Sequence, residues 1–299
     1  MRTLKKRKRF GDRTLHNEER NKIMKTTLIH LIAILTILMT SSCVVHSAKE
    51  DFGPAKTRNV AVTDFDQLSV SGGIKFVYVE GSTPKVTLQG PEGLLDFVKV
   101  SQEGKKLTVR VERKNSKSRA VYFNNPMDKI TVTVQSASLR DLQISGACEL
   151  KAEKISTAED FTLNASGASD MEIGTIRCAN AGIKCSGASN IDIERMKSGR
   201  STWRLSGASD VELKGMEGQS VELKASGSSD VDMVLNRMED IRVDASGASD
   251  IDLKFNHCGA AQVSSHGASD ITLKGELRSL IKEASKGSDI DEKGLTVGR

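Results

Sequence analysis

Residues 165–174 read ASGASDMEIG, and residues 245–254 read ASGASDIDLK. Related clusters recur along the second half of the chain, each centred on a glycine: Gly146, Gly167, Gly187, Gly207, Gly227, Gly247, Gly267 and Gly287. The first interval between these glycines is 21 residues, and each of the next six is 20 residues. A fixed period of this length over many copies is typical of a repeat architecture, so it decides the fold class before any single element is assigned.

Apolar residues alternate with polar residues on both sides of each glycine. For the first seven glycines, the positions four before are apolar and include Leu163, Trp203 and Leu223, whereas the positions between are polar, such as Lys184 and Arg204. The positions four and six after these seven glycines are apolar as well. This period-2 pattern predicts two short half-buried strands in every repeat, with Trp203 pointing into the core.

A unit of two short strands cannot bury its apolar face alone, so the repeats must stack. A hairpin meander would alternate strand direction and could not stack identical columns on themselves. We therefore expect an all-β fold, a right-handed parallel β-helix with one rung per repeat and a glycine at each corner. The expected single domain covers 59–292, with irregular first rungs over 59–140, regular repeats over 141–290 and a tail at 293–299. At the last rung we expect Glu283 to enter an apolar column.

The corner cluster allows several interpretations of its polar residues. Glycine suits a bend that needs positive φ, and the Ser before it and the Asp three after it can accept backbone N–H bonds there. The acids form a column of Asp170, Asp210, Asp230, Asp250 and Asp270, which Asn190 interrupts. Their carboxylates could be used by corner hydrogen bonds, could be solvated, or could form a calcium ladder. Corner hydrogen bonding is the preferred reading, so no metal site is predicted.

The net charge of +5 arises from the N-terminus. Residues 1–42 hold 10 Lys and Arg and 3 Asp and Glu, which leaves 34 basic and 36 acidic residues from Cys43 onward. This balance does not support a nucleic-acid-binding body. An apolar run over 28–39 follows Met24 and Lys25 and precedes Ser41, Ser42 and Cys43, which resembles a bacterial lipoprotein signal.

On this reading, 1–23 are an upstream extension, 24–42 the signal peptide, and 43–58 a lipidated cysteine with a polar tether. Whether translation starts at Met1 or Met24 stays open. The lipid on Cys43 would attach the protein to the outer membrane, facing the surface or the periplasm. Plain secretion is the alternative.

The repeated corners, the upstream stretch FDQLSVSGGIKFVYVEG and the lipoprotein-like start together resemble the auto-transporter adhesin head domain family, also called the GIN domain. The resemblance covers about residues 60–290. It implies an architecture similar to that of pectin-lyase-like β-helices without their catalytic residues. It also implies a role in cell adhesion.

No arrangement of residues in the sequence indicates an enzyme or a cofactor. Arg113, Lys114, Lys117 and Arg119 cluster in one loop, which we interpret as solvated surface. His257 and His266 fall in different columns, and of the cysteines only Cys178 and Cys185 are placed so that a disulfide is worth testing. The expected function is a non-enzymatic, membrane-anchored binding surface for adhesion or envelope organisation. The alternative is a β-helix that binds or cleaves polysaccharide. Partners could be a glycan, a protein or a second copy of the chain.

Overall fold

The computed structural model describes residues 52–112 and 126–298. The interpretations of the upstream extension, the signal, Cys43 and the basic loop at 113–125 fall outside these residues. The described residues belong to the compact unit that begins at Phe52.

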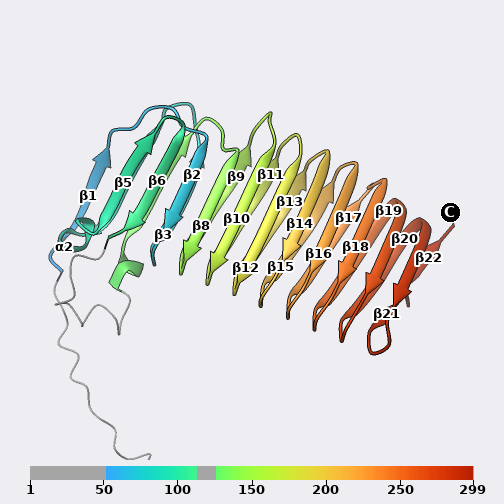
Figure 1. Cartoon of the computed structure of the whole chain (residues 1–299). Helices are drawn as coiled ribbons and strands as arrows, with labels where there is room; N and C mark the ends of the chain where they lie inside the picture. The colour runs from blue at the N-terminus through green and yellow to red at the C-terminus, as the bar shows by residue number, and fades with distance from the viewer. Residues whose placement is uncertain (1–51, 113–125, 299) are drawn as a thin grey trace, which may run out of the picture. The chain divides into compact units, whose positions relative to one another are not determined.

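This unit is a solenoid of stacked parallel coils, as the repeat predicts (Figure 1). Each regular coil has one strand before the corner glycine and one after it. The strands before the corner pair with one another along the stack, for example β10 with β12, and form what we call face 1. The strands after the corner, such as β11 and β13, form face 2. The two faces enclose one core.

The strands of face 1 are β2 (Gln67–Ser71), β5 (Val98–Glu103), β6 (Lys106–Val111), β8 (Asp141–Gly146), β10 (Phe161–Gly167), β12 (Ala181–Gly187), β14 (Arg200–Leu205), β16 (Ser220–Ala225) and β18 (Asp240–Ala245). Those of face 2 are β1 (Ala55–Val60), β3 (Lys75–Glu80), β4 (Lys85–Pro91), β7 (Thr131–Ser136), β9 (Glu149–Ser156), β11 (Asp170–Arg177), β13 (Asn190–Lys197), β15 (Asp210–Glu217), β17 (Asp230–Asn236), β21 (Asp289–Asp291) and β22 (Leu295–Val297). Strands β19 (Asp250–Ser265) and β20 (Asp270–Ala284) run through both faces, and the helical turns are α2 (Glu92–Leu95) and η2 (Pro126–Lys129).

The first coils do not stack in sequence order. The coil of β2 and β3 pairs directly with the coil of β8 and β9, so Ser71 lies opposite Ser145 although the two residues are far apart in the chain. On its other side it pairs with β6 and β7, also in parallel. Beyond these, β5, β4 and β1 add antiparallel strands at the end of the stack. Buried Leu94 and Leu95 of α2 belong to the core at this end.

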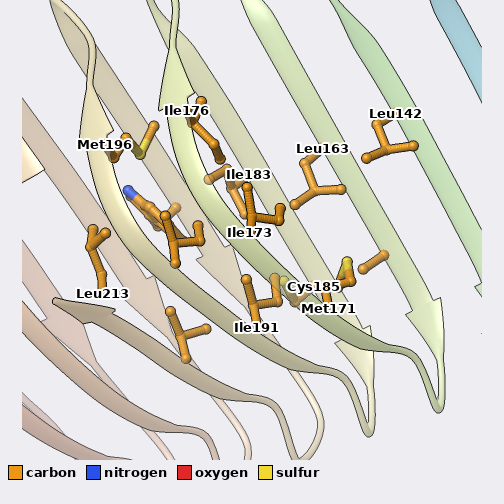
Figure 2. Packing of buried hydrophobic residues seen from close by; sticks show 14 of the residues in the cluster. Leu142, Leu163, Met171, Ile173, Ile176, Ile183, Cys185, Ile191, Met196 and Leu213 are labelled. Atoms are coloured by element: carbon orange, nitrogen blue, oxygen red, sulfur yellow. The ribbon is translucent and has the colours of Figure 1, made fainter. Parts of the chain in front are cut away.

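The inward columns form one continuous core through the described part of the chain. Figure 2 shows like residues from successive rungs packed over one another, for example Leu142, Leu163 and Ile183 from face 1. Ile173, Ile191 and Met196 contribute from face 2. Trp203 is fully buried in the column of Ile183 and Leu223, as the sequence predicts.

The C-terminal rung corrects one expectation. The register between β19 and β20 shifts after Phe255, which places Lys282 opposite the buried Val263 and Glu283 opposite Ser264. Lys282, and not Glu283, therefore lies at the register position of the apolar column, and its side chain is exposed there. Its ammonium lies 2.7 Å from a carboxylate oxygen of Glu292, so an ion pair forms at this end of the stack.

None of the helical segments in the described residues is long and apolar enough to cross a lipid bilayer.

Candidate functional site

The eight corner glycines form a ladder of closely stacked bends. Their φ angles lie between 78° and 101°, a region that favours glycine. The N–H of the next residue donates to the glycine carbonyl one rung earlier, as Ser228 does to Gly207 at 2.7 Å. A Cβ built on Gly227 would lie 2.4 Å from that same carbonyl oxygen. The glycine is thus required both by its backbone angle and by the closeness of the neighbouring rung.

The second serine of the cluster closes the bend from inside. Ser169, Ser189, Ser209, Ser229, Ser249 and Ser269 are all buried. Each hydroxyl donates to the carbonyl of the residue three positions earlier, for example Ser229 to Ser226 at 3.1 Å. Cys148 takes this position in the first regular corner, where its thiol lies 2.9 Å from the carbonyl oxygen of Gly72. The second serine, whose role was not expected from the sequence, thus satisfies a backbone acceptor that the bend leaves open.

The first serine of the cluster connects neighbouring rungs. The Ser226 hydroxyl donates to the Leu205 carbonyl at 3.1 Å, and the Ser246 hydroxyl donates to the Ala225 carbonyl at 3.3 Å. These hydroxyls act as donors, whereas the sequence analysis expects them to accept. The corner is therefore held by backbone and serine hydrogen bonds within and between rungs.

Replacing Ser229 with alanine should lower the free energy of unfolding by about 1 kcal/mol, because a buried hydrogen bond is lost and the Ser226 carbonyl is left without it. The matched control is Asp230→Ala in the adjacent exposed position, which should be neutral or slightly stabilising because Asp230 lies between Asp210 and Asp250. Urea unfolding followed by circular dichroism measures both. A larger loss for Asp230→Ala than for Ser229→Ala would contradict the hydrogen-bond assignment.

The acids of the cluster do not have the role that the sequence analysis preferred. Within residues 126–298, no backbone N–H donates to the side chain of Asp170, Asp210, Asp230, Asp250 or Asp270, and all five are exposed. In this column, Asn190 donates to Asp170 at 3.4 Å. The carboxylates point to solvent. The prediction that they form corner hydrogen bonds is therefore wrong, and the alternative of solvated acids is correct.

A second acidic column runs beside the first on face 2. We call the exposed acids of both columns the acidic columns: Asp170, Asp210, Asp230, Asp250, Asp270, Glu172, Glu212, Asp232 and Asp252. Partial burial and the neighbouring carboxylates of Asp270 and Asp230 raise the pKa of Asp250. Partial burial and the Asp252 carboxylate likewise raise the pKa of Asp232, although Lys274 opposes this shift. The fold therefore holds like charges close together along this face.

The raised pKa of Asp250 predicts a pH-dependent gain from Asp250→Asn. A folded-state pKa above the unfolded value means that the folded protein binds more protons, so stability falls as pH rises through that window. At pH 7 the repulsion is fully present, and Asp250→Asn should raise Tm slightly. Below the usual pKa of Asp the gain should vanish. Calorimetry at both pH values tests this.

Asp244→Asn is the control for this prediction, since Asp244 lies opposite Lys224 on face 1 and its removal should not stabilise the fold. A gain from Asp250→Asn that is equally large at acidic pH would argue against charge repulsion.

The calcium reading has no geometric support in the described residues. In 52–112 and 126–298, no group of three or more His, Cys, Asp or Glu side chains is arranged to hold a metal ion. His257 instead lies with Nδ1 2.6 Å from a carboxylate oxygen of Glu276.

Face 1 carries a short column of cations opposite in charge to face 2. Lys184, Arg204 and Lys224 are exposed and are direct cross-strand neighbours on β12, β14 and β16; we call them the basic column. They line a groove of about 490 Å³ together with corner serines such as Ser206. Lys224 lies 2.9 Å from Glu222, and this ion pair lowers the pKa of Glu222. Lys184 and Arg204 make no ion pair within the described residues.

The cysteines of the described residues are free thiols: Cys148, Cys178, Cys185 and Cys258. No disulfide joins Cys178 to Cys185, the pair for which a bond was worth testing. Burial raises the pKa of Cys185 to about 12 and, with the nearby Asp160 carboxylate, raises that of Cys178 to about 11. Thiols with such pKa values are poor nucleophiles at neutral pH, so these cysteines fill space in the core.

Several solved structures share this architecture at low sequence identity. A protein described as a putative adhesin from Bacteroides fragilis has a TM-score of 0.60 at 14% identity, with 80% of this chain and 96% of that chain covered. A putative lipid binding protein from Parabacteroides distasonis has a TM-score of 0.60 at 18% identity, with the same coverage. A putative adhesin from Parabacteroides merdae has a TM-score of 0.57 at 15% identity, covering 82% of this chain and 95% of that one. These likenesses show the fold alone.

No curated protein matches the chain by sequence. A family model described as "Putative auto-transporter adhesin, head GIN domain" matches residues 64–237, which include the first coil and the corners from Gly146 to Gly227. That match covers more than half of the chain. The protein therefore belongs to the auto-transporter adhesin head, or GIN domain, family.

Proposed function

We propose that this protein is a non-enzymatic adhesion protein of the cell envelope, attached to the outer membrane by lipid on Cys43. Membership of an adhesin head family supports an adhesion role at the cell surface or in the envelope. The observation that carries the proposal is the pair of extended faces, on which charged side chains repeat once per rung. The polar groups of the corners, by contrast, are used in hydrogen bonds that hold the fold together.

The geometry of the faces suits an extended partner. Outward side chains repeat at the spacing of neighbouring strands, about 4.8 Å, and their positions are set by the stacked backbone. The grooves on face 1 and face 2, of about 490 Å³ and 290 Å³, run across several rungs. Solenoids are commonly used in this way, because a long rigid surface can bind an extended ligand without conformational change.

The lipid anchor rests on the sequence before the solenoid. A cysteine after a short apolar run and two small residues is the arrangement that precedes lipidation in bacterial lipoproteins. A lipid there would tether the solenoid through the polar stretch before β1, which begins at Ala55 and already pairs with β4. Whether the anchored solenoid faces outward decides whether it can contact another cell.

To test this proposal, the full chain and its Cys43→Ser variant are expressed in a bacterium with an outer membrane. The wild type should incorporate labelled palmitate, should be shaved from intact cells by protease, and should increase adherence of the cells to a mucin-coated surface and to one another. Cys43→Ser should lose the label and the gain in adherence. A surface-exposed wild type that gives no gain would contradict the adhesion role.

The same protein can be used to test the alternative function, which is cleavage of polysaccharide. Incubation with polygalacturonate and other polyanionic glycans should release no unsaturated products. Turnover of any of them would favour the polysaccharide-cleaving β-helix over the adhesin.

A further inference from the structure

We propose that the protein associates with a second copy of itself by docking the basic column of one copy on the acidic columns of the other. The occupant of each charged face is thus the opposite face of an identical chain. This interaction goes beyond the adhesion role, since it assigns a partner and a surface that the family membership does not supply.

The basic column is a row of like charges in which Glu222 and Asp244 compensate Lys224, whereas Lys184 and Arg204 have no ion-pair partner among the described residues. Lys184 lies directly opposite Arg204, and Arg204 directly opposite Lys224. Like charges on facing positions of neighbouring strands are unfavourable, so an isolated chain gains nothing from this arrangement. Arg242 adds a fourth cation one column away, opposite Glu222. Glu222 and Asp244 are the acids among these residues, so the central part of face 1 stays positive.

The acidic columns are compensated at Glu172, which lies 3.0 Å from Lys151, and less so at the rungs that follow. Asp210, Asp230 and Asp250 are neighbours on consecutive rungs, and Glu212, Asp232 and Asp252 run beside them. The cations nearby are Lys214, Lys254 and Lys274, which line the groove on the far side of the second column. Lys274 reaches Asp252 only at 3.9 Å. Partial burial, followed by the neighbouring carboxylates, raises the pKa values of Asp232 and Asp250, and Lys274 opposes the shift only at Asp232.

The two sets of charges match in spacing because the same rungs produce both. Every rung contributes one position to a face 1 column and one position to each face 2 column, so cations and acids repeat at the same interval of about 4.8 Å. A row of three cations laid on a row of acids can therefore pair at every rung, and a shift by one rung preserves the match. Complementary rows of this kind favour association and suppress contacts between like faces.

The position of the faces determines the kind of assembly. Face 1 and face 2 lie on opposite sides of one core, so a copy that uses its face 1 keeps its face 2 available. Such a heterologous contact does not close on itself and generates open stacks of copies. Association should therefore continue beyond the dimer as concentration rises.

An acidic polysaccharide is the other ligand that a basic column could attract. The described residues favour it less, because no exposed aromatic side chain is present among them to stack on a sugar ring. A glycan would also leave the longer acidic columns without a role. A second copy accounts for both charged faces at once.

Sedimentation velocity of the full chain in mild detergent tests the proposal. The wild type should associate at low salt, and raising the salt from about 0.05 M to about 0.5 M should dissociate it. The variant K184E/R204E/K224E should weaken self-association at least about tenfold, and so should D210K/D230K/D250K. Mixing the two variants should restore association, because one is acidic on both faces and the other is basic at both docking surfaces.

The control variant K105E/R177E/K286E makes the same change in net charge at exposed positions away from both columns, and should associate like the wild type. The neutral variant K184Q/R204Q/K224Q removes the cations without adding acids, and circular dichroism establishes that each variant is folded. A monomeric wild type, or association that persists in folded charge-reversed variants, would overturn the proposal. So would a mixture of the two variants that stays dissociated.

A wild type that stays monomeric but binds heparin through the basic column would also overturn it and would assign that column to an acidic polysaccharide. Because association is measured in solution, its failure leaves the cell-adherence result independent. Adhesion without self-association would point to a foreign partner.

Discussion

Gly227→Ala should lower the free energy of unfolding by at least about 2–3 kcal/mol, one of the largest losses from adding a single methyl group to this protein. Gly227 has φ 86°, where an alanine costs about 1–2 kcal/mol. The new Cβ would lie 2.4 Å from the Gly207 carbonyl oxygen, so the two rungs must separate. Their separation weakens the hydrogen bond from Ser228 to Gly207, which contributes about 1 kcal/mol.

The matched control is Gly182→Ala on face 1. The Cβ there would meet only a methyl of Thr162 at 3.9 Å, and Gly182 does not have a positive φ. Alanine in that strand position should be neutral or should stabilise by about 0.5–1 kcal/mol, since it restricts the unfolded chain. Urea unfolding followed by fluorescence of Trp203, the single tryptophan of the chain, measures both variants. Equal midpoints for the two would contradict the stacked corner.

Trp203→Ala should cost about 3–5 kcal/mol, because the side chain is fully buried and its removal leaves a cavity in the inward column. Its neighbours along that column are Ile183 and Leu223, one rung away on either side. Unfolding must be followed by far-ultraviolet circular dichroism, since the variant lacks its fluorophore. Because each rung contacts only its neighbours, the loss should appear as weaker cooperativity around the central rungs as well as a lower midpoint.

Trp203→Leu separates packing from hydrogen bonding at the same site. The indole N–H has no hydrogen-bond partner among the described residues, so its removal costs no hydrogen bond. Leucine already occupies the next rung of the column at 223, and the loss should be clearly smaller than for alanine. If both variants stayed within about 1 kcal/mol of the wild type, the column would not be packed as described.

The regular coils were predictable because every rung buries the same kinds of side chain at the same positions of the repeat. The glycine period and the alternation around it are enough to place Trp203 inside and to set neighbouring rungs one strand spacing apart. The same parity also indicates which polar residue of each corner is buried. Ser229, two residues after Gly227, shares the parity of the inward positions, whereas Asp230, three residues after it, shares that of the outward ones.

The N-terminal part could not be predicted in the same way. Gly72 and Gly73 resemble an earlier corner, but the sequence does not show that the coil of β2 and β3 pairs with β8 and β9 across an intervening stretch of chain. Its register depends on long-range packing that only the folded structure shows. The shift that places the exposed Lys282 opposite the buried Val263 is similar, because a local change after Phe255 moves every later position by one residue.

The charged faces were only partly visible in the sequence. The polar positions between the apolar ones were evident, but which of them become direct neighbours depends on register. Lys184, Arg204 and Lys224 form one column, whereas Arg242 belongs to the next. The basic column and the acidic columns lie on different faces because each coil contributes one strand to face 1 and one strand to face 2.

The central claim is that each corner cluster adds one rung to a parallel stack, and pulsed electron paramagnetic resonance between spin labels tests it most directly. Labels are placed on cysteines introduced in one outward column, at Glu149, Asp170, Asp250 and Asp270, with Cys43 and Cys178 replaced by serine. Labels four, five and six rungs apart should be separated by about 19, 24 and 29 Å, an increase of about 4.8 Å per rung. Distances that fail to increase with the number of intervening corner glycines, or that increase by about twice this amount, would contradict the stacked solenoid.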